Sequence, residues 1–311
     1  MAKQTSAQIT ADIQSKMVNQ IIDLMETHGT GWTKPWATSG GGRLPENIAS
    51  KKRYRGINVL MLGMAGFSSN VWGTYKQWAG KKAQVMKGSK STTVIFWKPL
   101  EITDKATGEK KTIWMLRTYN VFNADQVEGW EAPAAPEPLE TPAGQPFDPL
   151  ECIAEMALRI GVEVRHGGEQ AFYSPSSDHV QMPETSSFIG TATSTPFEAY
   201  HSTFFHELAH ATGHKSRLDR LTASPFGGKG YAFEELVAEL TAVFLGVSEG
   251  VSAAPRADHA QYLASWLKAL KAEPKMLFKA ATEAAKAFDM LSPEAVATEA
   301  DVELELDDLA A

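Results

Sequence analysis

The sequence predicts a two-domain α+β protein. Its 311 residues exceed the roughly 100 to 200 that are typical of one domain. The charge changes sign along the chain, since residues 1–130 carry a net charge of +9 and the remainder carries −16. Between these halves, six prolines fall within residues 131–149, where missing amide donors favour an extended linker. We therefore expect a basic domain over 1–130, a linker over 131–149, a second domain over 150–291, and an acidic flexible tail over 292–311.

The composition excludes several classes of protein. With 22% charged and 43% hydrophobic residues, the chain is neither collagenous, nor a coiled coil, nor wholly disordered. Its single cysteine, Cys152, cannot form an internal disulfide, which favours a reducing compartment. No apolar run approaches the roughly 18 residues that a membrane span needs, and the opening segment lacks the apolar core of a secretory signal. We expect a soluble, cytoplasmic protein.

The basic domain contains both helical and strand patterns. From Ile9 to Met25, apolar residues recur at steps of three and four, which predicts an amphipathic helix with Thr10 as a possible cap. A second apolar helix is expected directly after the segment KKRYRG, which ends at Gly56. Residues 92–99 and 112–122 are rich in β-branched and aromatic side chains and should form a β-hairpin. This half is therefore α+β.

Cations interleaved with aromatic rings favour single-stranded DNA as the ligand of the basic domain. Unpaired bases can stack on rings while Lys and Arg follow the phosphates. Tyr54, flanked by four cations, is the ring that most favours a DNA contact, and Trp72 could be a contact or a core residue. Trp97 and Trp114 are expected in the core, because a domain of this size must bury large aromatics.

The acidic half contains the sequence HELAH, which predicts a metal site. His206 and His210 lie one helical turn apart, so both imidazoles can bind one Zn²⁺. Glu207 lies beside the metal, where its carboxylate can accept a proton from water in the general-base role of an HExxH metallopeptidase. The alternative is a helix with two core histidines and a surface glutamate.

A catalytic zinc needs a third protein ligand. The position ten residues after His206 is Ser216, which excludes the metzincin pattern. A mostly apolar helix is predicted over residues 231–246, and its carboxylates need a metal, a cation or a histidine as partner. The pair Glu235 and Glu239 resembles the glutamate-zincin arrangement, so we expect Glu235 as the ligand and Glu239 as the residue that orients a ligand histidine. The reverse assignment stays open, and Glu234 is expected to point away.

Other segments of the acidic half complete the predicted fold. Residues 178–184 have strand character and could form an edge strand against which a peptide pairs. His214 could stabilise an oxyanion or cap the HExxH helix. Two further helices are expected over residues 260–272 and 274–291, and nothing in them indicates catalysis.

The motifs in both halves resemble those of one known family. RYRGINVLML, WGTYKQW, VMKGSKSTTVIFWKP and YNVFNADQVEG are similar to the N-terminal single-stranded-DNA-binding domain of ArdC-type antirestriction proteins, which also occurs fused to plasmid primases. FYSPSSDHVQMPE, FHELAHATGHKSRLDR and FEELVAELTAVFLG resemble the zincin-like metallopeptidase domain that follows it. The resemblance runs from about Met17 to Gly246.

This resemblance implies a protein of plasmids or related mobile DNA that shields incoming DNA from restriction endonucleases in a recipient bacterium. It implies zinc on His206, His210 and Glu235, with Glu207 as the base. It also implies that single-stranded DNA contacts a group of basic, aromatic and amide side chains, namely Arg53, Tyr54, Arg55, Asn58, Trp72, Lys76, Gln77, Lys87 and Lys90.

Two hypotheses of function follow. In the first, the protein binds single-stranded DNA and its zinc peptidase cleaves a restriction endonuclease or another protein near that DNA. In the second, the zinc is structural, and protection arises from binding DNA or a restriction enzyme, to which the acidic half presents a DNA-like electrostatic field.

Overall fold

The computed structural model describes most of both predicted domains. The described residues are 6–28, 43–103, 109–131, 147–189, 194–221, 228–251 and 270–292. Most of the predicted linker, the helix predicted over 260–272 apart from its last residues, and the acidic tail beyond Ser292 lie outside them.

The N-terminal domain contains a four-stranded mixed sheet in the order β1-β2-β5-β4. β1 (Glu46–Asn47) runs parallel to β2 (Val71–Thr74), and the other pairs are antiparallel. The predicted hairpin is confirmed by β4 (Thr92–Thr103) and β5 (Lys110–Asn123), which pair along the whole length of β4. A small second sheet joins β3 (Gln84–Val85) to β6 (Val127–Glu128). The short 3₁₀ helix η3 (Ala124–Gln126) directly precedes β6 in the chain.

Three helices lie within the described residues of this domain. The predicted amphipathic helix is α1 (Ser6–His28), and the apolar helix after KKRYRG is α3 (Ile57–Met64). Because α1 begins four residues before Thr10, the prediction that Thr10 caps it is wrong. The short α4 (Tyr75–Gly80) begins with a capping box, in which Thr74 and Gln77 each bond the other's backbone N–H.

Asn58 and Gln77, which were predicted to contact DNA, are instead buried hydrogen-bonding residues. Asn58 donates to the Ile95 carbonyl at 2.8 Å and accepts from the Ile95 amide at 2.9 Å, which satisfies the backbone of edge strand β4 where α3 covers it. Gln77 exchanges two hydrogen bonds with the side chain of Asn47. Both predictions are wrong because buried backbone and side-chain polar groups need partners of this kind.

The two aromatic residues predicted as DNA contacts are also in the core. Tyr54 is only 2% exposed, and its hydroxyl accepts a hydrogen bond from Asn47 at 3.0 Å. Burial raises the pKa of Tyr54, and the bond from Asn47 only partly opposes this shift. Trp72 is likewise 2% exposed and packs edge-on against Phe67. Neither ring presents a face on which a base could stack, so both predictions are wrong.

The two tryptophans expected in the core are exposed. Trp97 is 40% exposed on β4, and Trp114 is 63% exposed on β5. Helix α3 packs on the base of β4, where residues 94–96 are buried, and exposure increases from there toward the tip of the hairpin. Trp97 and Trp114 therefore give the hairpin a large aromatic surface that is exposed to solvent.

The second domain has a helical body with a small sheet. α6 (Pro196–Thr212), α7 (Lys229–Ser248) and α9 (Lys275–Leu291) pack together, and α5 (Glu151–Ile160) contacts α6 and α9. The sheet has the order β7-β9-β8. The strand predicted near residue 180 is β9 (His179–Met182), but it lies between β7 (Glu163–His166) and β8 (Phe172–Ser174). Both edges of β9 are paired, which excludes the interpretation of this segment as an edge strand against which a peptide pairs.

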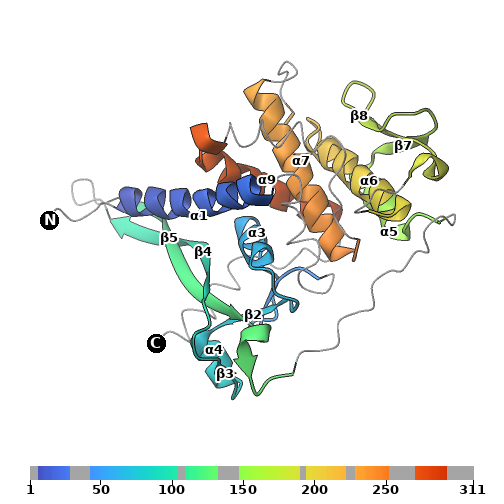
Figure 1. Ribbon diagram of the computed structural model, residues 1–311. Coiled ribbons are helices and arrows are strands. Elements are labelled where there is room, and N and C mark those ends of the chain that lie inside the picture. The colour runs from blue at the N-terminus through green and yellow to red at the C-terminus, as the bar shows by residue number, and fades with distance from the viewer. Residues whose placement is uncertain are drawn as a thin grey trace.

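The two domains share one continuous hydrophobic core. Figure 1 shows α1 and α3 between the β4–β5 hairpin and the helices of the second domain, and both contact α9. Arg55 forms an ion pair with Asp289 of α9 beside this contact. Gly56 adopts a φ of +55°, and a Cβ there would lie 3.4 Å from the Ala281 carbonyl oxygen. A Cβ would fit at this distance, so it is the positive φ that favours glycine at this position beside α9.

None of the helices among the described residues is both long enough and apolar enough to span a membrane.

His201 connects the start of the second domain to α6. Its Nδ1 lies 2.6 Å from the Phe197 carbonyl and must donate, while its Nε2 accepts from the Leu150 amide at 3.1 Å. Only the neutral ring can make both bonds. Burial lowers the pKa of His201 to about 4, although the bond to Phe197 opposes this shift.

We predict a pH-dependent loss of stability that His201→Gln reduces. Below the ordinary pKa of 6.5, the unfolded chain takes up a proton at this position and the folded chain does not until about pH 4. The free energy of unfolding should therefore fall as pH decreases through this window, by at most about 1.4 kcal/mol per pH unit from this group. Urea unfolding at several pH values should show a shallower slope for His201→Gln, and equal slopes would contradict the assignment.

Candidate metal centre

Helix α6 positions the HExxH residues. Thr195 and Glu198 form a capping box at its start, Pro196 occupies the first turn, and Gly213 ends it as predicted. A continuous helix places His206 and His210 one turn apart on the face that packs against α7.

Three side chains converge as metal ligands would. The Nε2 atoms of His206 and His210 are 3.0 Å apart, and each lies 3.6–3.7 Å from a carboxylate oxygen of Glu235 on α7. Tetrahedral coordination with bonds of about 2.0–2.1 Å would separate two ligand atoms by about 3.3–3.4 Å. Among the described residues, these three form a cluster whose ligand atoms all lie within 4.8 Å of one another. The donor set therefore fits a divalent cation, with two imidazoles and one carboxylate.

Each ligand histidine also faces a second carboxylate. Nδ1 of His206 lies 3.0 Å from Oε1 of Glu239, the residue expected to orient a histidine. Nδ1 of His210 lies 3.2 Å from Oε1 of Glu234, which in turn accepts two hydrogen bonds from Arg220. The prediction that Glu234 points away is wrong. The prediction considered only the position of Glu234 around the axis of its own helix, α7. The partners of the Glu234 side chain are set instead by His210 on α6 and by Arg220.

The electrostatics favour the ionised forms of Glu234 and Glu235. Burial alone would raise the pKa of Glu234, but hydrogen bonds from His210 and Arg220 outweigh it, so its pKa lies below the ordinary value. Burial alone would also raise the pKa of Glu235. The hydrogen bond from His206 and the charge of His210 outweigh this effect, so the pKa of Glu235 lies below its ordinary value. An ionised Glu235 is the form that can bind a cation.

Glu207 is held against an edge strand. It is buried, and its Oε2 accepts a hydrogen bond from the backbone N–H of Tyr173 at 2.8 Å. Tyr173 is the middle residue of β8, an outer strand of the small sheet. Because this N–H points toward Glu207 and not toward β9, the unpaired edge of β8 faces the HExxH helix. The edge strand beside the candidate centre is therefore β8, in place of the predicted β9.

A partly buried ion pair fixes β8 relative to α6. Arg217 donates to both oxygens of Asp178 and to the carbonyls of Ile160 and Ala211. The hydroxyl of Tyr173 donates to the same Asp178 at 2.7 Å. Sequence reasoning missed this pair, because no motif connects residues 39 positions apart. His214 bonds the Ser216 hydroxyl at 2.7 Å, just beyond the end of α6.

The basic residues predicted to bind DNA do not form one cluster. Arg53 and Arg55 line a cavity beside α9. Lys76 is exposed on α4, and Lys87 and Lys90 are exposed between β3 and β4. These five cations remain candidate phosphate contacts, but on separate parts of the surface.

Two known protein families match separate parts of the chain. Residues 11–122 match the family described as the N-terminal domain of anti-restriction factor ArdC. Residues 151–283 match the family described as zincin-like metallopeptidase.

The chain is also similar to proteins along nearly its whole length. Protein y4eC of Sinorhizobium fredii is 36% identical over 303 residues, which cover 94% of this chain and 95% of that protein. A DNA primase TraC of Escherichia coli is 35% identical over 304 residues, but this region spans only 27% of the primase.

Two solved structures of the antirestriction ArdC protein from the R388 plasmid resemble this one. The metal-free form has a TM-score of 0.75 at 36% identity and covers 91% of this chain and 98% of its own. The Mn(II)-bound form has a TM-score of 0.71 at 35% identity, with 92% and 99% covered.

We predict that Glu239→Gln weakens metal binding by about 10- to 100-fold, because the carboxylate that orients His206 is lost. Competition with a chromophoric chelator for Zn²⁺ or Mn²⁺ measures this affinity. Glu169→Gln, an exposed residue of the same domain, is the matched control and should bind like the wild type. Equal affinities for both variants would show that Glu239 does not act on the metal ligand.

Proposed function

This chain belongs to the ArdC family of antirestriction proteins, and we propose that it protects incoming plasmid or other mobile DNA from restriction endonucleases in the bacterial cytoplasm. In this proposal, the N-terminal domain binds single-stranded DNA, and the zincin-like domain is a zinc-dependent peptidase. The observation that carries the DNA part is the exposed aromatic surface of the β4–β5 hairpin.

The hairpin offers what an unpaired strand needs. Trp97 and Trp114 lie on the same face, because Trp97 pairs with Leu116 and Trp114 with Pro99, two positions farther along each strand. Large exposed rings are unfavourable on a surface without a ligand, and stacking of bases gives them a function. The same two strands also contain cations that could follow phosphates, namely Lys98, Lys110, Lys111 and Arg117.

Zinc is the metal that the donor set favours. Two imidazoles with one carboxylate are typical of catalytic zinc sites, and imidazole nitrogen binds Zn²⁺ more strongly than Mn²⁺. His206, His210 and Glu235 would hold the ion. A bound zinc would act as a Lewis acid toward a peptide carbonyl and would make water more acidic.

The protein groups around this site support peptide hydrolysis. The unpaired edge of β8 can receive an extended peptide through backbone hydrogen bonds beside α6. Glu207 would take a proton from the attacking water and deliver it to the leaving amine. Its bond from Tyr173 holds one oxygen and leaves the other available for this transfer.

A second candidate function keeps the zinc as a structural ion. The net charge of −16 on the chain after residue 130 favours it, because such a field resembles that of DNA and could bind a restriction enzyme directly. The two functions differ in whether protection needs Glu207.

We predict that Glu207→Gln abolishes peptide cleavage and leaves metal affinity unchanged, because it removes the proton acceptor and retains the hydrogen bond from Tyr173. Loss of a general base typically costs about 10²- to 10⁴-fold in rate. Mass spectrometry of a bacterial proteome-derived peptide mixture, incubated with the zinc-loaded protein, measures the cleavage. Cleavage at the same rate by both proteins would refute the peptidase assignment.

The same variant separates the two candidate functions. In a plasmid-transfer assay into a restricting host, loss of protection by Glu207→Gln supports the peptidase as the effector. Full protection by the variant, with cleavage abolished, supports the structural-zinc alternative.

We predict that Trp114→Ala weakens the binding of single-stranded DNA by about 5- to 150-fold, the equivalent of about 1–3 kcal/mol for one stacked base. Phe172→Ala removes an exposed ring from the acidic domain and should have no effect. Fluorescence anisotropy with a labelled oligothymidylate measures both affinities, and equal affinity of Trp114→Ala and wild type would exclude stacking on this ring.

A further inference from the structure

A groove lies between the two domains where β4 approaches α9. It has a volume of about 500 Å³, within the range of about 300–1,000 Å³ that is typical of ligand sites. On one side it is lined by residues 95–97 of β4, and on the other by residues of α9 from Lys275 to Lys286. A smaller cavity of about 170 Å³ adjoins it, since Arg55, Gly56 and Ala285 line both.

The α9 side of the groove is basic, in contrast to the acidic domain that contains it. Lys275, Lys279 and Lys286 are exposed and line the groove. Their spacing of four and seven residues places them on one face of the helix. Lys279 and Lys286 each have a carboxylate partner, but these pairs are exposed and contribute little in water, so a polyanion can compete for both lysines.

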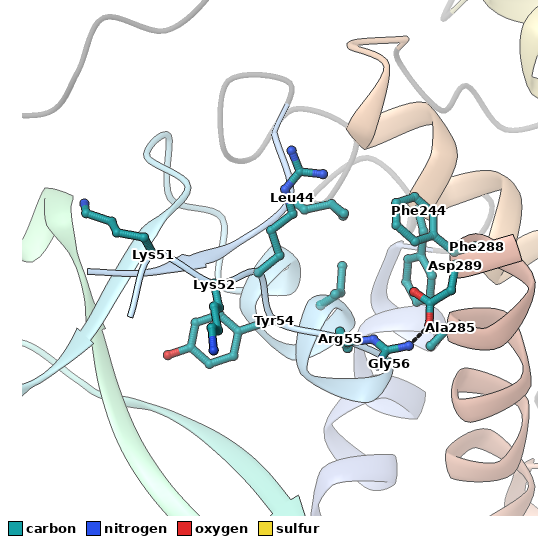
Figure 2. Close-up of a pocket in the computed structure, with 12 residues that line it drawn as sticks. Leu44, Lys51, Lys52, Tyr54, Arg55, Gly56, Phe244, Ala285, Phe288 and Asp289 are labelled. Atoms are coloured by element: carbon teal, nitrogen blue, oxygen red, sulfur yellow. Dashed lines mark ion pairs between the residues drawn. The ribbon is translucent and has the colours of Figure 1, made fainter. Parts of the chain in front are cut away.

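The N-terminal domain continues the positive charge through the smaller cavity. Figure 2 shows Arg55 directed at Asp289 on α9 and Lys52 beside Tyr54, whereas the side chain of Lys51, which also lines the cavity, extends away from α9. Together the two cavities are lined by seven cations and two carboxylates, and two further carboxylates, Glu46 and Glu273, pair with Lys51 and Lys279 from outside the lining. The excess positive charge therefore crosses the boundary between the domains.

The β4 side supplies the aromatic surface. Trp97 lines the groove and is the hairpin tryptophan nearer to the base of β4. Trp114 continues the same face toward the tip, diagonal to Trp97 across the strand pair. A strand of bases stacked on these rings would have the lysines of α9 across the groove from it.

We propose that single-stranded nucleic acid occupies this groove, so that α9 of the metal-binding domain forms half of the DNA-binding surface. The proposal rests on the DNA binding proposed above and assigns it to both domains. Charge complementarity and the adjacent rings carry it: a cationic wall suits any polyanion, whereas a cationic wall opposite an exposed indole suits unpaired nucleotides.

The test is charge reversal on α9 in the full-length protein. Lys275→Glu combined with Lys279→Glu should weaken binding of a labelled oligothymidylate of about 16 nucleotides by about tenfold or more at low salt. The double variant should also reduce the slope of log K against log salt concentration by about 1.4, because two phosphate contacts are lost. Lys275 begins α9, where a glutamate is favoured, so folding should be retained.

A matched control makes the same change of net charge elsewhere in the domain. Arg159→Glu combined with Lys215→Glu alters two exposed cations that do not line the groove and should change the affinity by less than about threefold. Photocrosslinking with 5-iodouracil in the oligonucleotide should attach it to Trp97, which locates the strand without any mutation.

Each contrary result is distinct. Equal losses of affinity in both double variants would show that only the long-range electrostatic field of the protein affects DNA binding. Normal affinity of the α9 variant, together with weakened binding by Trp114→Ala, would limit the DNA to the hairpin. Either result overturns this inference and leaves the proposed function standing. Displacement of the oligonucleotide by polyglutamate at equal residue concentration would assign the groove to acidic polypeptides and overturn it as well. Failure of the wild type to bind the oligonucleotide would instead refute the proposed DNA binding itself.

Discussion

Pairing of buried charge is the constraint on which the second domain depends. Helix α7 carries Glu234, Glu235 and Glu239 into a mostly apolar interior, and each would be very unfavourable there alone. The packing of α6 against α7 resolves this by placing two histidines between the three carboxylates, with Arg220 closing the network on the outer side. The same contacts orient both imidazoles toward Glu235, so the requirement for pairing also assembles a site that fits a divalent cation.

Burial, rather than residue type, separates the structural from the surface aromatic residues in the basic domain. Tyr54 and Trp72 are enclosed by the sheet, α3 and neighbouring side chains, whereas Trp97 and Trp114 lie along a hairpin that extends past its covering helix. The exposed rings then become the surface most suited to unpaired bases. Tyr54, although surrounded by cations in the sequence, contributes through a buried hydrogen bond with Asn47.

The continuous core explains why the two domains should be considered together. Apolar residues of α1 and α3 belong to the same buried cluster as those of α7 and α9, and Arg55 forms an ion pair with Asp289 of α9 beside this contact. Because the domains are packed and not merely tethered, their facing surfaces form a groove with contributions from both. The basic stripe of α9 lies on this shared surface. The net charge of its half of the chain is strongly acidic, so a count along the sequence does not reveal the stripe.

The sequence by itself determined the two-domain α+β class, the hairpin, the HExxH helix and the choice of candidate metal ligands, because each depends on short-range spacing and on charge that is counted along the chain. Tertiary structure decided which groups those elements meet. It put Glu234 on His210, made β8 rather than β9 the free edge, buried Asn58 against β4 and exposed Trp97. Periodicity reports which face of an element is apolar, but the partner of that face is set by packing between segments far apart in the chain.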